Sequence, residues 1–155
     1  STRPGKIQAL RALKPGAKVP VDATLDEVHP ASFAALVIPG GTISADKLRV
    51  NLRALEFIRS FDRTRKPIAA MGHATWILAS AGVLRGRRLT GWPGAQDDVA
   101  NAGGEWVDEP VVVDGNLLTS RTTKDIGKFT KRLVKHFAKQ AEDSTGTLIE
   151  AEAGA

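Results

Sequence analysis

Two short, continuous apolar runs, each closed by glycine, constrain the fold of this chain more than any other feature of its sequence. Residues 33–38 (FAALVI) end at Pro39-Gly40-Gly41, and residues 67–71 (PIAAM) end at Gly72-His73. An unbroken apolar run of this length predicts a strand buried on both faces, as in a parallel sheet covered by helices. A helical pattern follows each run. The alternation of strand, tight turn and helix predicts an α/β domain with a mainly parallel sheet.

The helical segments show apolar residues at three- and four-residue spacing. One helix is expected over about residues 46–61, and its buried side would consist of Leu48, Leu52, Leu55, Ile58 and Phe61. Further helices are expected at 74–81 and 95–101. The last helix should follow a cap at Thr122 or Thr123. Its buried side would consist of Ile126, Phe129, Leu133, Val134 and Phe137.

Shorter strands are expected between these helices. Residues 88–90 form one candidate. Residues 111–113 and 117–120 flank Asp114-Gly115, and an Asp-Gly pair between two apolar runs predicts a β-hairpin.

Length and local composition divide the chain into three zones. Its 155 residues fit one domain of ordinary size. Residues 1–30 are rich in proline and glycine and are expected to be irregular, with one short strand around 18–21. Residues 31–140 carry the α/β pattern. Residues 141–155 are acidic and rich in small side chains, so they are expected to form a flexible tail.

Composition also excludes several classes of protein. The chain contains no cysteine, which removes disulfides, thiolate zinc sites and cysteine nucleophiles together. No apolar run approaches the roughly 20 residues that cross a bilayer, and the sequence predicts a cytoplasmic protein with no membrane contact. His29 and His136 lack metal-ligand spacing with His73, so neither a metal nor a cofactor is expected.

The net charge of +5 permits attraction to nucleic acid. The last helix carries six basic residues, namely Lys124, Lys128, Lys131, Arg132, Lys135 and Lys139. Nucleic-acid binding would favour aromatic residues between these charges, but Phe129 and Phe137 belong to the apolar stripe. A solvated helix face is therefore the preferred interpretation, and a nucleic-acid partner is not expected. The tryptophans Trp76, Trp92 and Trp106 are expected to pack rather than to bind a cofactor.

The ends of the two buried strands are the best place for a functional site, because ligands of α/β sheets bind outside the carboxyl ends of the strands. Glycines at such ends leave backbone N–H groups available to a ligand. Gly40, Gly41 and the amide of His73 could together bind an oxyanion or a carboxylate. The alternative is a pair of tight turns whose glycines serve only the backbone conformation.

Long segments of this sequence resemble the PfpI family of intracellular proteases and deglycases, within the class I glutamine-amidotransferase-like superfamily. The segments are FAALVIPGG, SADKLRVN, KPIAAMGHATWILASAGVLRGRRLTGWPG and NAGGEWVDEPVVVDGNLLTSR, together with the closing helix. They cover about two thirds of the chain. The resemblance implies a flavodoxin-like, three-layer α/β/α sandwich. It also implies a homo-oligomer, either a dimer or a hexamer.

The resemblance assigns roles to individual residues. The family's nucleophilic Cys stands in the elbow between strand and helix, and Gly72 occupies that position here. His73 matches the family's His, and Gly40 and Gly41 match its oxyanion-side glycines. Asp46 aligns with an acidic residue that, in close relatives, reaches the His of an adjacent subunit. The orienting groups are therefore present without the nucleophile, and covalent catalysis of the family type is not expected.

A second departure concerns the N-terminal side. Members of the family usually begin with a strand, a helix and a further strand, and nothing in residues 1–15 resembles that segment. The resemblance therefore implies an N-terminally incomplete domain. It also implies an unpaired strand edge that favours association.

Three functions remain open from the sequence. The first is a degenerate, stress-associated binding or assembly domain without catalysis, like the appended C-terminal domain of large catalases. The second is an active hydrolase, protease or deglycase acting on a small carbonyl or peptide substrate, with His73 as general base and Asp46 as its orienting group. The third is a basic protein associated with nucleic acid, whose affinity would fall steeply with salt.

Overall fold

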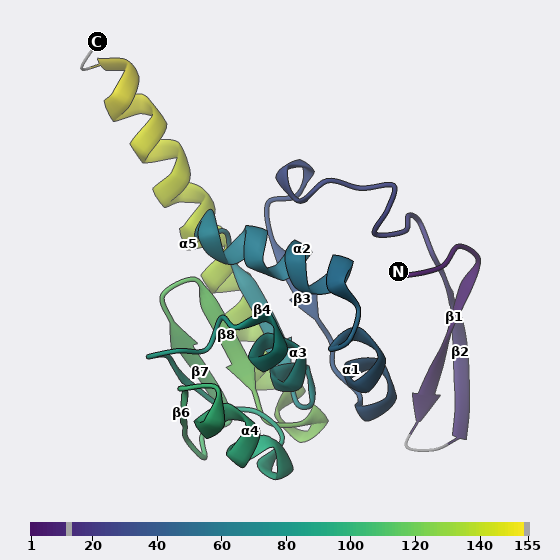
Figure 1. Ribbon diagram of the computed structural model, residues 1–155. Coiled ribbons are helices and arrows are strands. Elements are labelled where there is room, and N and C mark those ends of the chain that lie inside the picture. The colour runs from purple at the N-terminus through teal and green to yellow at the C-terminus, as the bar shows by residue number, and fades with distance from the viewer. Residues whose placement is uncertain (12–13, 154–155) are drawn as a thin grey trace.

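The computed structural model describes the backbone of residues 1–11 and 14–153 and the side chains of residues 1–10 and 14–141. A four-stranded sheet forms its centre, in the order β3-β4-β8-β7 (Figure 1). β3, β4 and β8 are parallel, and β7 runs antiparallel to β8. The mainly parallel sheet is confirmed. The strands are β3 (Leu36–Ile38), β4 (Ile68–Met71), β7 (Val111–Asp114) and β8 (Leu117–Ser120).

Helices cover both faces of this sheet, which confirms the three-layer α/β/α fold. One layer contains α1 (Thr42–Leu48), α2 (Leu52–Arg63) and α3 (Ala74–Ala81). The other contains α5 (Ile126–Ala153), which passes along the opposite face (Figure 1). A peripheral unit joins α4 (Gln96–Asn101) to a parallel pair of two-residue strands, β5 (Arg88–Leu89) and β6 (Glu105–Trp106).

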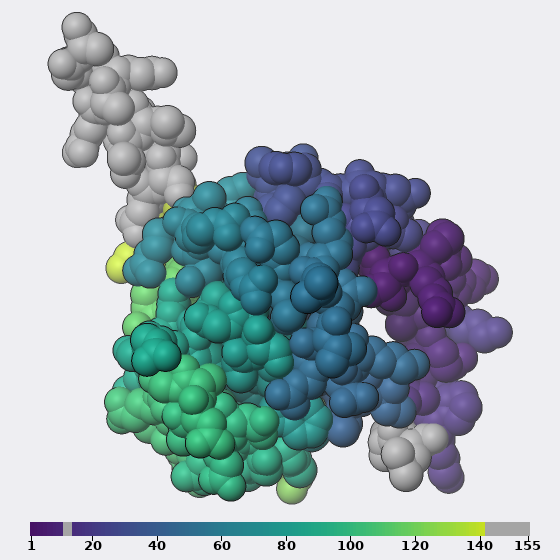
Figure 2. Space-filling model, in the orientation of Figure 1, coloured from purple at the N-terminus to yellow at the C-terminus, as the bar shows by residue number. Residues whose placement is uncertain are grey.

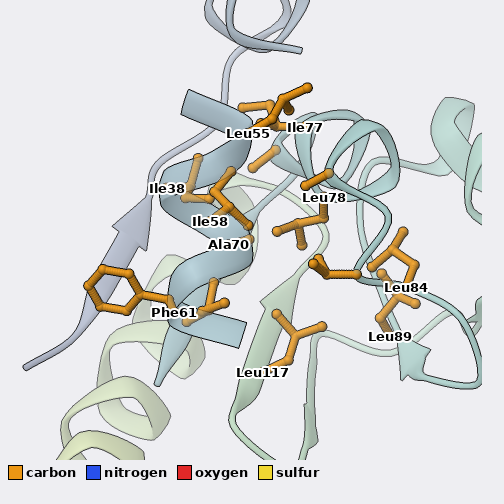
Figure 3. Packing of buried hydrophobic residues seen from close by; sticks show 14 of the residues in the cluster. Ile38, Leu55, Ile58, Phe61, Ala70, Ile77, Leu78, Leu84, Leu89 and Leu117 are labelled. Atoms are coloured by element: carbon orange, nitrogen blue, oxygen red, sulfur yellow. The ribbon is translucent and has the colours of Figure 1, made fainter. Parts of the chain in front are cut away.

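The two layers divide the hydrophobic core. The larger cluster lies between the sheet and the helices α2 and α3, where Phe61, Ile77 and Leu78 are almost fully buried (Figure 3). A smaller cluster contains Met71 and Phe129 and lies on the α5 side. Alternate residues of β4 enter the two clusters, as the pleat of a strand requires. β4 is thus buried on both faces, as its sequence predicted.

β3 differs from its prediction. It contains only Leu36–Ile38, and 44% of the surface of Val37 is exposed. β3 is the last strand on its side of the sheet, and no strand of the described chain pairs with its outer edge. The apolar run 33–38 therefore predicted a strand correctly but its burial on both faces wrongly, because α5 packs on β7 and β8 and a sequence pattern does not show which strands a helix covers.

The single helix predicted over residues 46–61 is wrong in detail, because two helices occupy this region. The chain leaves the helical path after α1, and the side chain of Asn51 accepts a hydrogen bond of 2.9 Å from the N–H of Ala54. Asn is a strong N-cap, so α2 begins anew at Leu52. Leu52, predicted to be buried, is 78% exposed for this reason.

The N-terminal zone was predicted to be irregular, but the structure shows regular strands there. It forms an antiparallel hairpin of β1 (Lys6–Arg11) and β2 (Lys14–Pro20). The hairpin lies at the side of the domain, and a gap is visible between parts of the two (Figure 2). A cavity of about 360 Å³ separates them, lined by Ile7 on the hairpin and by Phe33 and Leu36 on the domain. Most side chains of the hairpin are solvated on both faces. Its sequence (residues 7–16, IQALRALKPG) therefore shows only weak alternation of polar and apolar residues, which is the usual signal of a strand.

The last helix is confirmed with two exceptions. The side chain of Thr122 caps a 3-10 turn that leads into α5, and Phe129 is buried. Ile126 and Val134 are 51% and 61% exposed, since the buried stripe is narrower than predicted. α5 continues to Ala153. Residues 154–155 and the side chains after 141 lie outside the described residues, so the flexibility of the tail stays a prediction.

The hairpin of β7 and β8 is confirmed, with Gly115 in the left-handed conformation at its turn. Within the described residues, none of the helices is both long enough and apolar enough to span a bilayer.

Candidate functional site

The turn after β3 packs directly against the turn after β4. Gly40 has a φ of +88°, and a Cβ atom on it would lie 2.1 Å from the carbonyl oxygen of Met71 and 3.5 Å from the nitrogen of Ala74. Atoms cannot approach so closely, and only glycine fits at position 40. The predicted meeting of the two strand ends is therefore built into the packing of the backbone.

The elbow at Gly72 is held by its own backbone. Gly72 is buried and has a φ of +58°, in the region that favours glycine. Its N–H donates a hydrogen bond of 2.8 Å to the carbonyl of Ser120, and its carbonyl accepts one of 3.1 Å from Oγ1 of Thr75. A Cβ on Gly72 would meet only the carbonyl oxygen of Arg121, at 3.3 Å. The elbow therefore keeps its shape without a side chain at position 72.

Two helices begin at this junction. Gly41 is the N-cap of α1 and His73 is the N-cap of α3. In the described part of the chain, neither N–H donates a hydrogen bond to another protein group. Unpaired N–H groups at a helix start carry partial positive charge. The sequence analysis assigned these donors, together with Gly40, to an oxyanion or carboxylate, and that role stays a prediction.

His73 is enclosed by aromatic rings. Trp92 stacks on its ring with the centroids 5.1 Å apart and an angle of 19° between the planes. Trp76 meets it edge to face at 4.9 Å. Burial lowers the pKa of His73, because an apolar environment disfavours the imidazolium ion. The imidazole is therefore more readily neutral, the form in which it can accept a proton or a hydrogen bond.

The side chain that meets His73 from α1 is Thr42. Its Oγ1 lies 3.2 Å from Nε2 of His73 and 3.5 Å from Nδ1. Sequence analysis missed Thr42, because it placed the start of this helix at about residue 46. Asp46 is exposed and has no hydrogen bond or ion pair within the described residues. In a single chain, therefore, Asp46 does not orient His73, and its contact with a second copy stays a prediction.

A polar network holds Trp76 in place. Its Nε1 donates a hydrogen bond of 3.0 Å to Asp98, which lies 3.6 Å from the guanidinium of Arg49. Arg49 also lies over the ring of Trp76, 5.5 Å from its centroid, and Nε of Arg49 donates to Oγ of Ser80. This arrangement couples α1, α3 and α4. Trp76 is thus a packing residue, as predicted, and its ring is held in a fixed position beside His73.

The other two histidines lie away from this site. His136 is buried, and its Nε2 is 3.3 Å from the carbonyl oxygen of Asn116. His29 caps the 3-10 turn at Pro30–Ser32. Among the described residues, no group of three or more His, Asp or Glu side chains has the arrangement of a metal site.

Comparison with known proteins connects this geometry to a family. The model of the DJ-1/PfpI family matches residues 6–136. The chain belongs to the DJ-1/PfpI family. The match begins at the N-terminal hairpin, well before residue 31, where the sequence analysis placed the start of the domain. Within this family, Gly72 stands at the position of the nucleophilic Cys.

Named relatives are similar over most of the chain. Deglycase PfpI of Pyrococcus furiosus is 46% identical over 122 residues, which cover 79% of this chain and 73% of that protein. Protein/nucleic acid deglycase 2 of Escherichia coli is 42% identical over 129 residues, covering 83% of this chain and 74% of the relative. Among solved structures, a ThiJ/PfpI domain protein from Brachyspira murdochii has a TM-score of 0.80 at 25% identity, over 89% of this chain and 77% of the other.

Proposed function

We propose that this chain is a DJ-1/PfpI domain that recognises small carbonyl compounds or peptide adducts at the Gly72-His73 elbow without forming a covalent intermediate. We further propose that it works in the cytoplasm as a stress-associated binding or assembly domain. Recognition would use the N–H groups of Gly41 and His73 as donors to the ligand's oxygen.

The observation that carries this proposal is the elbow without a thiol. A thiolate is the family's means of attacking a carbonyl carbon, and position 72 supplies no nucleophilic atom. The next hydroxyl along the chain, Thr75, is fully buried and donates its hydrogen bond to the carbonyl of Gly72. It is therefore not available to replace the thiol. The two glycine turns, His73 and the starts of α1 and α3 lie together around position 72.

A second candidate is deglycase activity, which the names of the similar proteins favour. In this mechanism a water molecule attacks the carbonyl carbon while His73 accepts its proton, and the carbonyl oxygen becomes the oxyanion bound by the two N–H groups. Collapse of this tetrahedral intermediate re-forms the carbonyl and breaks the bond to the substrate's amine, which leaves with the proton returned by His73. The lowered pKa of His73 keeps the base unprotonated near neutral pH. Thr42 would orient the imidazole through its hydroxyl group.

One experiment separates the two candidates. Methylglyoxal consumption is measured for the natural chain, for Gly72→Cys and for His73→Ala, with Gly86→Cys as a control that places a thiol in another left-handed glycine turn. Binding without turnover is followed by NMR shifts of the Gly41 and His73 amides. We expect shifts but no turnover in the natural chain, and turnover roughly 100-fold higher in Gly72→Cys than in Gly86→Cys.

The other outcomes are equally informative. Turnover by the natural chain that disappears in His73→Ala would replace the first candidate by the second. Absence of both amide shifts and turnover in every variant would contradict recognition of carbonyl compounds.

Assembly is the second part of the proposal. Asp46 is exposed on α1, and we expect it to reach His73 of a second copy in a dimer or hexamer. Light scattering of Asp46→Arg should show a smaller particle than the natural chain, with Lys47→Asp as a control for an altered charge on the same helix. An unchanged mass for Asp46→Arg would remove this interface from the proposal.

A further inference from the structure

A groove with a cationic wall lies on the face of the sheet opposite the α1–α3 layer. Two adjoining cavities of about 320 and 270 Å³ lie between β7 and α5, and Val113 and Arg132 line both of them. We call their combination the α5–β7 groove. The half-buried side chains of Val111 and Val113 form its apolar floor. Its cationic wall consists of Lys128, Arg132, Lys135 and Lys139.

The helix itself places these four cations on one side. They follow one another at intervals of four, three and four residues, which is the spacing of one face of an α-helix. From Lys128 to Lys139 the helix rises about 16 Å, at roughly 1.5 Å per residue. All four residues are exposed. The groove thus presents a row of positive charges beside an apolar floor.

No acidic side chain lines the groove, and none of its four cations forms an ion pair within the described part of the chain. On the N-terminal side of the groove, the acidic residue just before α5, Asp125, is held by two hydrogen bonds of 3.1 Å from Arg121. These hydrogen bonds are the main cause of its lowered pKa, and the charge of Lys128 adds to the effect. Like charges three or four residues apart destabilise a helix. An acidic ligand would relieve that repulsion.

The chain carries a segment of matching chemistry at its own end. Between Ile126 and Ala141 the sequence of α5 contains no acidic residue. After residue 141 it contains no basic residue but four acidic ones, Glu142, Asp143, Glu150 and Glu152, with Leu148 and Ile149 among them. Acidic side chains could pair with the wall of the groove while the two apolar side chains contact its floor.

We propose that the α5–β7 groove binds the acidic end of α5, residues 142–152, from a second copy of the chain. The contact must come from a second copy because α5 is one continuous helix to Ala153 (Figure 1). A helix carries its own end away from its beginning, so the acidic end cannot fold back onto the groove of the same chain. Carboxylates near a helix C-terminus are also unfavourable, and opposing cations stabilise them.

The positive charge of the α5–β7 groove and its apolar floor together favour an acidic peptide segment over a nucleic acid. Binding of single strands relies on aromatic side chains on which bases stack. The α5–β7 groove has a valine floor, and Phe129 beneath it is buried in the smaller core cluster. Apolar aliphatic contacts flanked by cations suit a peptide that alternates acidic and apolar residues.

Fluorescence anisotropy with a labelled peptide of residues 141–155 tests the proposal. The acceptor is the full chain with Glu150→Lys and Glu152→Lys, so that its own acidic end does not compete. We expect saturable binding that weakens with added salt, since screening shortens the reach of exposed charges. Adding Arg132→Glu and Lys135→Glu should weaken binding about tenfold or more. A control with Lys18→Glu and Lys47→Glu, which changes the charge equally elsewhere, should bind like the acceptor.

A charge exchange provides an independent readout. Chains with Arg132→Glu and Lys135→Glu are mixed with chains carrying Glu150→Lys and Glu152→Lys. Sedimentation velocity should show association of the mixture beyond that of either variant alone, because each supplies the surface that the other has reversed.

Two results would overturn the proposal. One is peptide binding that is the same with and without the reversed groove charges, while circular dichroism shows all variants to be folded. The other is a single-stranded oligonucleotide that binds through Arg132 and Lys135 more tightly than the peptide, which would identify a nucleic-acid groove instead.

Discussion

Gly40 and Gly72 end neighbouring parallel strands and both have positive φ angles, but they are glycines for different reasons. A Cβ on Gly40 would overlap the carbonyl oxygen of Met71 at 2.1 Å. A Cβ on Gly72 would lie 3.3 Å from the carbonyl oxygen of Arg121, and a shift of a few tenths of an ångström relieves that contact. Steric exclusion fixes the first residue, whereas only the backbone dihedral favours glycine at the second.

The difference shows how the elbow can accommodate glycine or a residue with a side chain at position 72. The elbow is held by the hydrogen bond that the N–H of Gly72 donates to Ser120 and by the one that its carbonyl accepts from Thr75, and neither involves a side chain at position 72. A residue with a side chain can occupy the elbow at modest conformational cost, and glycine can replace it without rearrangement. Exchange between glycine and a nucleophilic residue at position 72 therefore changes the available chemistry greatly and the structure little. At position 40 the same exchange would change the structure greatly and the available chemistry little.

Among these substitutions, Gly40→Ala is expected to cause the largest loss of folding stability. Strain from a positive φ adds to the overlap with a backbone carbonyl, and together they should lower the free energy of unfolding by about 3 kcal/mol or more. Urea denaturation followed by circular dichroism measures the change. Gly41→Ala is the matched control, because its φ is +96° but nothing lies within 4 Å of the added Cβ. Equal losses for the two variants would show that dihedral strain, rather than the contact with Met71, governs the turn.

A smaller loss is expected for Gly72→Ala. The added methyl group costs about 1–2 kcal/mol for a left-handed residue, and the contact with the carbonyl of Arg121 adds little. The same denaturation experiment should rank Gly72→Ala well below Gly40→Ala. A loss as large as that of Gly40→Ala would refute the distinction between the two turns, and it would mean that the elbow does not tolerate a side chain.

The sequence predicted these turns but not the difference between them. Apolar runs closed by glycine revealed β3 and β4, because burial and turn geometry leave local signals. The close approach of Gly40 to Met71 joins residues 31 positions apart, which no local pattern contains. Thr42 and Trp92 were missed as neighbours of His73 for the same reason: Thr42 begins α1, Trp92 precedes the 3-10 turn at Pro93–Ala95, and only the folded chain brings them together.

The predicted fold was also wrong where a helix cap or a neighbour in space determines the local structure or the burial of a side chain. Asn51 interrupts a helical pattern that apolar spacing alone joined together. Val37 is exposed on the face where α5 packs on β7 and β8 rather than on β3. The family resemblance supplied the topology and the role of position 72, neither of which follows from periodicity.

The smallest change in folding stability is expected from the titration of His73. Its pKa depends on how far its ring is buried at the elbow. Burial lowers this pKa below its ordinary value of 6.5, so between the two values the unfolded chain binds a proton that the folded chain does not. Stability should therefore fall as the pH decreases from about 6.5 through the folded pKa. Because His73 is partly exposed, solvent screening keeps this loss below about 1 kcal/mol.

Trp92→Ala should uncover the ring and raise the pKa of His73 toward 6.5, as an NMR titration of the imidazole protons would show. Phe33→Ala is the matched control, since Phe33 and Trp92 are each 41% exposed and Phe33 packs on Phe57 instead. If the pKa of His73 is the same in Trp92→Ala as in the natural chain, the tryptophan does not close the elbow. Recognition at Gly72-His73 would then depend on the backbone of the two glycine turns alone.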